Sequence, residues 1–95
     1  MDKSQTMQSM EKAVDGAVKY FAEMMKTSGM RVSNVRLEEI IKSDDNKYWN
    51  ITLSYIDATS AGPFAEIYGA KDAERVNKLI EVDASSFEVV SMKNR

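Results

Sequence analysis

The chain has 95 residues with 13 basic and 15 acidic side chains, so its formal net charge is only −2. A chain of this length builds one hydrophobic core, and we expect a single domain over residues 1–95. The near-neutral charge and the absence of histidine and cysteine exclude a strongly basic nucleic-acid binder, histidine-dependent chemistry and a disulfide framework.

The chain also contains no long apolar run. Residues 1–6 are mostly polar, and uninterrupted apolar stretches are two or three residues long. These features predict neither a signal peptide nor a membrane span, and no membrane partner. The expected location is the cytoplasm, or a secreted or periplasmic site if a signal is removed before this numbering begins.

Residues 4–28 have a helical period. Apolar side chains recur at spacings of three and four from Met7 to Met24, whereas the chain after Gly29 changes to alternating, β-branched runs. Gly29 follows Ser28 and predicts a left-handed stop. The apolar positions span an arc of roughly 120° at about 100° per residue, the width of a helix that lies on a sheet. They are Met7, Met10, Val14, Ala17, Val18, Phe21, Met24 and Met25.

Three lysines, Lys12, Lys19 and Lys26, lie on the opposite side of this helix at a spacing of seven. Such a row could contact an anionic surface. Acidic residues lie beside it, however, and Asp15 precedes Lys19 by four residues, a favourable ion-pair spacing. We therefore expect a solvated face that is functionally neutral.

Residues 31–56 predict an antiparallel hairpin. The first strand alternates from Val32 to Ile41 but slips near Glu38 and Glu39, as at a β-bulge. A polar five-residue turn over 43–47 follows.

The second strand of this hairpin has the most regular alternation in the chain. One face carries Trp49, Ile51, Leu53 and Tyr55, and the other carries Asn50, Thr52 and Ser54. We expect the Trp49 face to meet the helix. The indole of Trp49 should then pack against Phe21 and against Val18 or Met25.

Residues 57–73 form a long connection that is rich in Ala, Thr, Ser and Gly. Connections longer than about 12 residues in a compact domain are mostly functional or disordered. Exposed apolar side chains in loops are frequent binding anchors, so we name Pro63, Phe64, Ile67 and Tyr68 as candidate partner-binding residues. The alternative is that the three large apolar residues form a short edge strand or pack under the end of the sheet.

Residues 74–93 predict a second hairpin, with strand-like runs from Arg75 to Asp83 and from Phe87 to Met92. The element order is then one helix and four strands. We expect an α+β fold in which the N-terminal helix packs on a curved antiparallel sheet.

The segment from Ile80 to Val90 has the sequence Ile-Glu-Val-Asp-Ala-Ser-Ser-Phe-Glu-Val-Val. It resembles the last hairpin of PepSY-type domains, where a strand ending in Val-Asp-Ala turns over Thr-Gly and returns as Glu-Val-Val. An N-terminal helix and strands like 35–38 and 48–53 occur in the same order. The chain departs from the family where Ser86-Phe87 replaces the turn glycine and where the 57–73 connection exceeds a short link.

This resemblance implies a helix packed on an antiparallel sheet and a regulatory or inhibitory binding role, often towards peptidases and often outside the cytoplasm. The element order is also similar to that of cystatin-like folds. The Gln-Val-Val-Ala-Gly loop of cystatin inhibitors is absent, so that inhibitory activity is not implied.

Motifs that carry chemistry are missing from the sequence. There is no glycine-rich phosphate loop, no nucleophile elbow and no calcium loop around Asp44. Glu38 and Glu39 are adjacent in a strand, so we expect their carboxylates on opposite faces, where they cannot act on one substrate atom. We expect no catalytic residue, no metal and no cofactor, and an enzyme is the less favoured class.

Two functional classes remain open. The first is a small binding or regulatory module that contacts a protein partner or forms a homodimer, through the 57–73 loop or a sheet edge, without catalytic activity. The second is a small-ligand binder or weak enzyme with a pocket between helix and sheet, lined by Trp49, Tyr55 or Tyr20. An internal cavity with convergent polar atoms would favour the second class.

Overall fold

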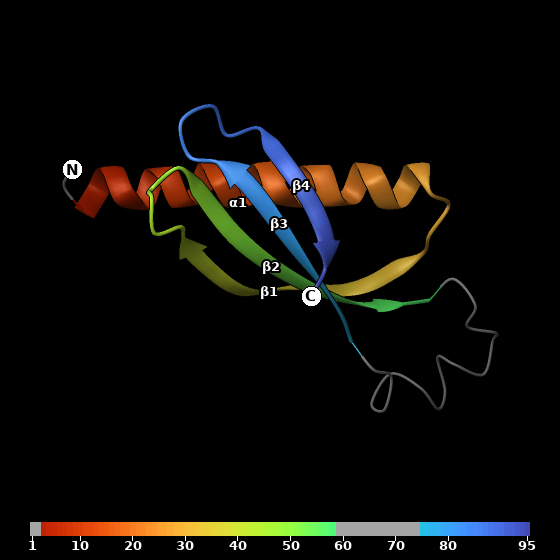
Figure 1. Cartoon of the computed structure of the whole chain (residues 1–95). Coiled ribbons are helices and arrows are strands. Elements are labelled where there is room, and N and C mark those ends of the chain that lie inside the picture. The colour runs from red at the N-terminus through yellow and green to blue at the C-terminus, as the bar shows by residue number, and fades with distance from the viewer. Residues whose placement is uncertain (1–2, 59–74) are drawn as a thin grey trace.

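The computed structural model of the chain describes residues 3–58 and 75–95. One helix is followed by four strands, which are α1 (Lys3–Thr27), β1 (Val32–Lys42), β2 (Tyr48–Asp57), β3 (Val76–Asp83) and β4 (Val89–Asn94). The strands form one antiparallel sheet in the order β1-β2-β3-β4, and α1 lies across one face of it (Figure 1). This arrangement confirms the predicted fold class. Within the described residues, no helix has the length and apolar character needed to cross a bilayer.

A Schellman motif ends α1 at the predicted glycine. Gly29 has a φ of 71°, and its N–H donates to the carbonyl of Lys26 at 3.1 Å, while the N–H of Met30 donates to the carbonyl of Met25 at 2.9 Å. These bonds satisfy carbonyls that have no partner within the helix, and glycine takes the left-handed conformation without Cβ strain. The predicted stop is confirmed.

The buried stripe of α1 is rotated relative to the predicted one. Ala13, Ala17, Phe21 and Met25 are buried at intervals of four residues, whereas Met7 and Val18 of the predicted stripe are exposed. The reason is the position of the helix, which packs against β3, β2 and β4. The side of α1 that carries Val18 therefore faces the region above β1.

The helix-facing side of β2 is buried as predicted, with Trp49, Ile51, Leu53 and Tyr55 in the core. The ring centroids of Phe21 and Tyr55 are 5.1 Å apart. Because six residues of strand span about 20 Å, Trp49 lies far from Tyr55, and the predicted contact between Trp49 and Phe21 is wrong. The ammonium group of Lys42 lies 5.1 Å from the centre of the Trp49 ring instead.

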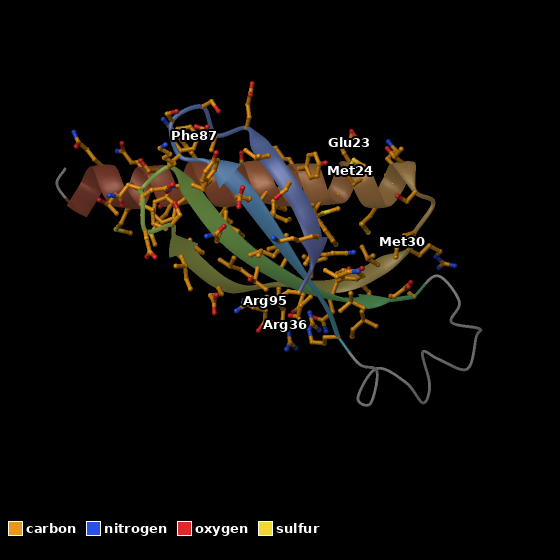
Figure 2. The ribbon with its side chains drawn as sticks, in the orientation of Figure 1. Glu23, Met24, Met30, Arg36, Phe87 and Arg95 are labelled. Atoms are coloured by element: carbon orange, nitrogen blue, oxygen red, sulfur yellow. The ribbon has the colours of Figure 1, made fainter. Side chains whose placement is uncertain are left out.

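Gly16 allows the turn between β3 and β4 to approach the helix. A Cβ at Gly16 would lie 3.2 Å from the carbonyl oxygen of Phe87, closer than ordinary contact. Phe87 has a φ of 61°, so a phenylalanine takes the left-handed turn position where the PepSY-type hairpin has glycine. Its ring, seen beside α1 in Figure 2, lies 5.6 Å from the Lys12 ammonium group.

Arginine side chains cover β2 on the face of the sheet away from α1. Arg75 donates from Nε to the hydroxyl of Ser54 at 2.8 Å, and Arg95 donates to the hydroxyl of Thr52 at 2.7 Å. Figure 2 shows Arg95 on this side of the sheet. Thr52 and Ser54 are therefore buried although they point away from the helix.

A bulge in β1 brings Glu38 and Glu39 to this same face. The register with β2 shifts between Leu37 and Glu39, which confirms the predicted irregularity. Because a bulge sets two residues opposite one, Glu38 accepts a hydrogen bond from the Ser54 hydroxyl at 2.8 Å while Glu39 pairs with Arg95 at 3.1 Å. The expectation that the two carboxylates point to opposite faces is wrong for this reason.

Asp83 holds the turn between β3 and β4. Its Oδ1 accepts hydrogen bonds from the backbone N–H groups of Ser85 and Ser86 at 2.8 and 2.9 Å and from the Ser85 hydroxyl at 2.7 Å. These bonds, with the one from the Ser86 backbone contributing most, lower the pKa of Asp83 to about 2.

We expect Asp83→Asn to change how stability depends on acid. Because the folded-state pKa is below the ordinary value of 3.8, the contribution of the carboxylate is present above that value and lost as the pH falls through about 2. Thermal unfolding from neutral pH to about pH 2 should show a smaller fall in melting temperature for Asp83→Asn than for the wild type in this acidic window. Asp44→Asn, in the other hairpin turn, is the control, and identical pH profiles for Asp83→Asn and the wild type would contradict the prediction.

We expect Trp49→Ala to lower the free energy of unfolding by about 3–5 kcal/mol, because it empties a buried site. Trp49→Phe should lower it by less than half as much, since most of the ring volume stays and the indole N–H has no acceptor among the described residues. Urea unfolding measures both losses. A loss below about 1 kcal/mol for Trp49→Ala would contradict the burial of this side chain.

Candidate functional site

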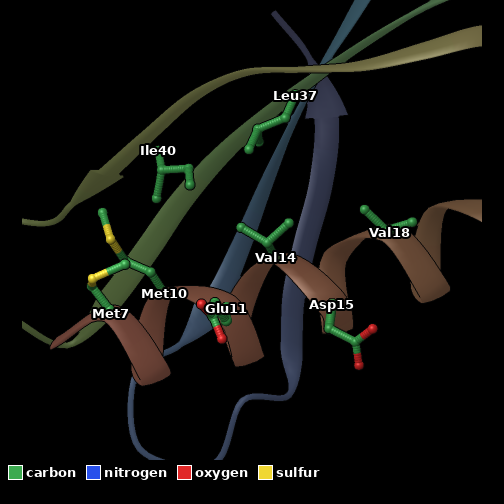
Figure 3. A pocket seen from close by; sticks show the side chains of 8 residues that line it. All are labelled: Met7, Met10, Glu11, Val14, Asp15, Val18, Leu37 and Ile40. Atoms are coloured by element: carbon green, nitrogen blue, oxygen red, sulfur yellow. The ribbon is translucent and has the colours of Figure 1, made fainter. Parts of the chain in front are cut away.

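An apolar groove runs between α1 and β1, where the helix leaves the sheet uncovered. Its first half has a volume of about 500 Å³ and is lined mainly by Met7, Met10, Val14 and Val18 of α1 and by Leu37 and Ile40 of β1. Figure 3 shows the two β1 side chains pointing towards the helix across this space. We call this feature, together with its second half, the α1–β1 groove.

The second half continues towards the end of α1. It has a volume of about 520 Å³ and is lined by apolar side chains that include Phe21, Met25, Met30 and Val35. Val18 lines both halves. The groove therefore follows most of the length of the helix, with Val18 near its middle.

Exposed apolar side chains gather along this groove. Among the described residues, six large apolar side chains are exposed, and four of them line it, namely Met7 at 60%, Val18 at 40%, Val35 at 43% and Leu37 at 47%. Single exposed apolar residues are ordinary on protein surfaces, but a contiguous group marks an interaction site. The clustering thus sets the groove apart from the rest of the described surface.

The two halves of the groove carry opposite charges. Glu11 and Asp15 line the first half, with Asp15 at the middle of α1 and paired with Lys19 at 2.9 Å, whereas Lys26 and Arg31 line the second half near the last turn of the helix. The apolar floor is therefore flanked by acidic side chains in one half and by basic side chains in the other.

The three lysines of α1 do not share one environment. All are exposed, as predicted, but Lys12 lies over the Phe87 ring and Lys26 lines the groove. The predicted ion pair between Lys19 and Asp15 is confirmed at 2.9 Å, and its hydrogen bond raises the pKa of Lys19. The functional neutrality of the lysine row stays a prediction. Lys26 differs from the other two lysines because it lines the groove.

The free edge of β1 is poorly suited to pairing with another strand. Its register is interrupted between Ser33 and Arg36 and again between Leu37 and Glu39, and Asn34 has a φ of 56°. Bulges bend an edge strand and break the row of N–H and C=O groups that a partner strand would need. We therefore place the candidate site in the groove and not at this edge.

The predicted partner-binding residues Pro63, Phe64, Ile67 and Tyr68 lie outside the described residues, so their role stays a prediction. The groove was not predicted as a partner-binding site, and the pocket between helix and sheet that the small-ligand alternative expected has another lining. A helical period shows which side chains share a face, but not how much of that face the sheet covers. The sequence feature that bears on the groove is the width of the apolar arc of α1, which includes Met7 and Val18, side chains that the sheet does not bury.

The lining differs from that expected of a small-ligand pocket. Trp49 and Tyr55 are buried in the core, and neither they nor Tyr20 lines the groove. Its acidic and basic side chains lie in different halves and do not converge on one point. The described residues also contain no cluster of three or more acidic side chains arranged to hold a metal ion.

Comparisons of the chain with family models, curated proteins and solved structures give no match. The structure shows the expected α+β fold, with an N-terminal helix and a four-stranded antiparallel sheet, and no match identifies a PepSY-type or cystatin-like family.

We expect Val18→Asp to leave the free energy of unfolding within about 1 kcal/mol of the wild type in a dilute sample, because this side chain packs loosely on its own chain. Phe21→Ala, three residues along the same helix, should cost about 3–5 kcal/mol. Urea unfolding of the two variants checks the contrast. A loss above about 3 kcal/mol for Val18→Asp would assign Val18 to the core and remove it from the groove surface.

Proposed function

We propose that the chain is a small protein-binding module that buries apolar side chains of a protein in the α1–β1 groove and has no catalytic role. The observation that carries this proposal is the gathering of Met7, Val18, Val35 and Leu37 along one groove. Their burial by a partner would remove apolar surface from water, which is the main favourable term in most protein association.

The extent of the groove favours a polypeptide over a small molecule. Met7 and Met25 line its two halves, and these positions are 18 residues apart, which corresponds to about 27 Å of helix. Small-molecule sites are concave and bury most of the ligand, with a few polar groups that fix its orientation. A long apolar groove flanked by charged side chains corresponds better to the binding of an amphipathic protein segment.

The resemblance to PepSY-type domains adds the hypothesis that the module regulates the protein it binds, for instance a peptidase. The shared order of elements supports this hypothesis. The left-handed φ of Phe87 also supports it, because the substituted turn position keeps the conformation of a turn glycine. The cytoplasm stays the expected location.

Photo-crosslinking tests the proposal. A benzophenone amino acid replaces Val18 in the full chain, and the same amino acid replaces Val90 in the control. Val90 is an apolar side chain of β4, 54% exposed and outside the groove. In the cells that produce the chain, we expect protein adducts from position 18 and none above background from position 90.

Mass spectrometry identifies the adducts. Equal yields at the two positions would indicate non-specific contact and contradict the proposal. The absence of any protein adduct at position 18 would also contradict it.

A further inference from the structure

We propose that the α1–β1 groove binds the same groove of a second copy of this chain, with the two α1 helices antiparallel about a two-fold axis beside Val18. This inference rests on the proposed function, since it names the protein that occupies the groove.

The position of Val18 makes the groove compatible with two-fold symmetry. Val18 lines both halves of the groove, so an axis beside it sets the first half of one groove against the second half of the other. In an antiparallel pair centred there, Glu11, seven residues before Val18, comes opposite Lys26, eight residues after it. The symmetry produces this contact twice, as in any isologous interface.

The charges of the groove fit this arrangement and no parallel one. Glu11, in the first half of one groove, meets Lys26, in the second half of the groove of the second copy. Asp15 comes opposite Phe21 of the second copy and is paired with Lys19 of its own chain at 2.9 Å. In a parallel pair, Glu11 would face Glu11 and Lys26 would face Lys26. Because like charges repel across an interface, the parallel pair is disfavoured, and the charge pattern favours the antiparallel pair.

The side chains of α1 that face the groove permit close contact between helices. Val14, Val18 and Ala22 are short and lie near the centre, which suits interaxial distances of about 8–10 Å. The flexible Met7 and Met25 lie towards the ends, where methionine adapts to irregular gaps. Val35 and Leu37 of β1 then close the remaining side of the apolar interior.

Charge reversal tests the inference on the full chain. The variants are Glu11→Lys, Lys26→Glu and the double variant Glu11→Lys/Lys26→Glu, and sedimentation equilibrium measures their monomer–dimer constants. Each single variant creates two like-charge contacts in the symmetric pair and should weaken dimerisation by about tenfold. The double variant restores opposite charges at both contacts and should dimerise nearly as well as the wild type.

A mixture of the two single variants provides the most specific test of the antiparallel pairing. One chain then carries lysine at both positions and the other glutamate at both, so the mixed dimer has two attractive contacts. We expect mixed dimers to form in preference to either variant alone. Glu23→Lys on α1 and Lys93→Glu on β4, both outside the groove lining, make the same charge changes elsewhere and should leave the constant unchanged.

Two outcomes overturn the inference. They are a chain that stays monomeric at high concentration, and a dimer whose dissociation constant is unchanged by both single charge reversals.

The crosslinking experiment distinguishes this inference from the proposed function. An adduct at position 18 with twice the mass of the chain supports self-association, an adduct with a different protein keeps the proposed function but overturns this inference, and no protein adduct overturns both. Circular dichroism confirms that each variant is folded before its constant is compared.

Discussion

A single helix is too narrow to cover this four-stranded sheet, and the rest of the surface follows from that constraint. A helix is about 10 Å wide, whereas four strands spaced about 4.8 Å apart span roughly 14 Å between the outermost two, without their side chains. Gly16 and the turn at Phe87 position α1 close to the β3–β4 side. The strip that the described part of the chain leaves uncovered therefore lies over β1, and the apolar side chains there are exposed along the α1–β1 groove.

Within residues 3–58 and 75–95, side chains and not a second layer of secondary structure cover the opposite face of the sheet. Arg75 and Arg95 lie over β2 and satisfy the hydroxyl groups of Ser54 and Thr52. A buried hydroxyl without a partner would be costly, so the arginines allow β2 to carry polar residues on a buried face. β2 is thus buried on both faces, whereas β1 is well covered on neither face.

Local patterns in the sequence predicted the elements, and relations between elements were mostly not predictable. The Gly29 stop, the irregularity near Glu38 and the buried Trp49 face depend on spacing within one segment. The contact of Arg95 with Thr52 joins residues 43 positions apart and depends on the register of three strands. The groove depends likewise on where the helix sits across the sheet, which no periodicity encodes. The predicted loop site over 63–68 lies outside the described residues.

Because β2 is buried on both faces and β1 is not, the two strands differ in their local stability. The backbone hydrogen bonds of β2 are shielded on both faces, so opening them requires most of the core to separate, at a free energy close to that of global unfolding. β1 has one free edge, two interruptions in its ladder and exposed side chains on both faces. We expect β1 to open at a lower free energy than β2 and β3. The strand that forms one wall of the groove is therefore also the one whose fluctuations would adjust the width of the groove to whatever it binds.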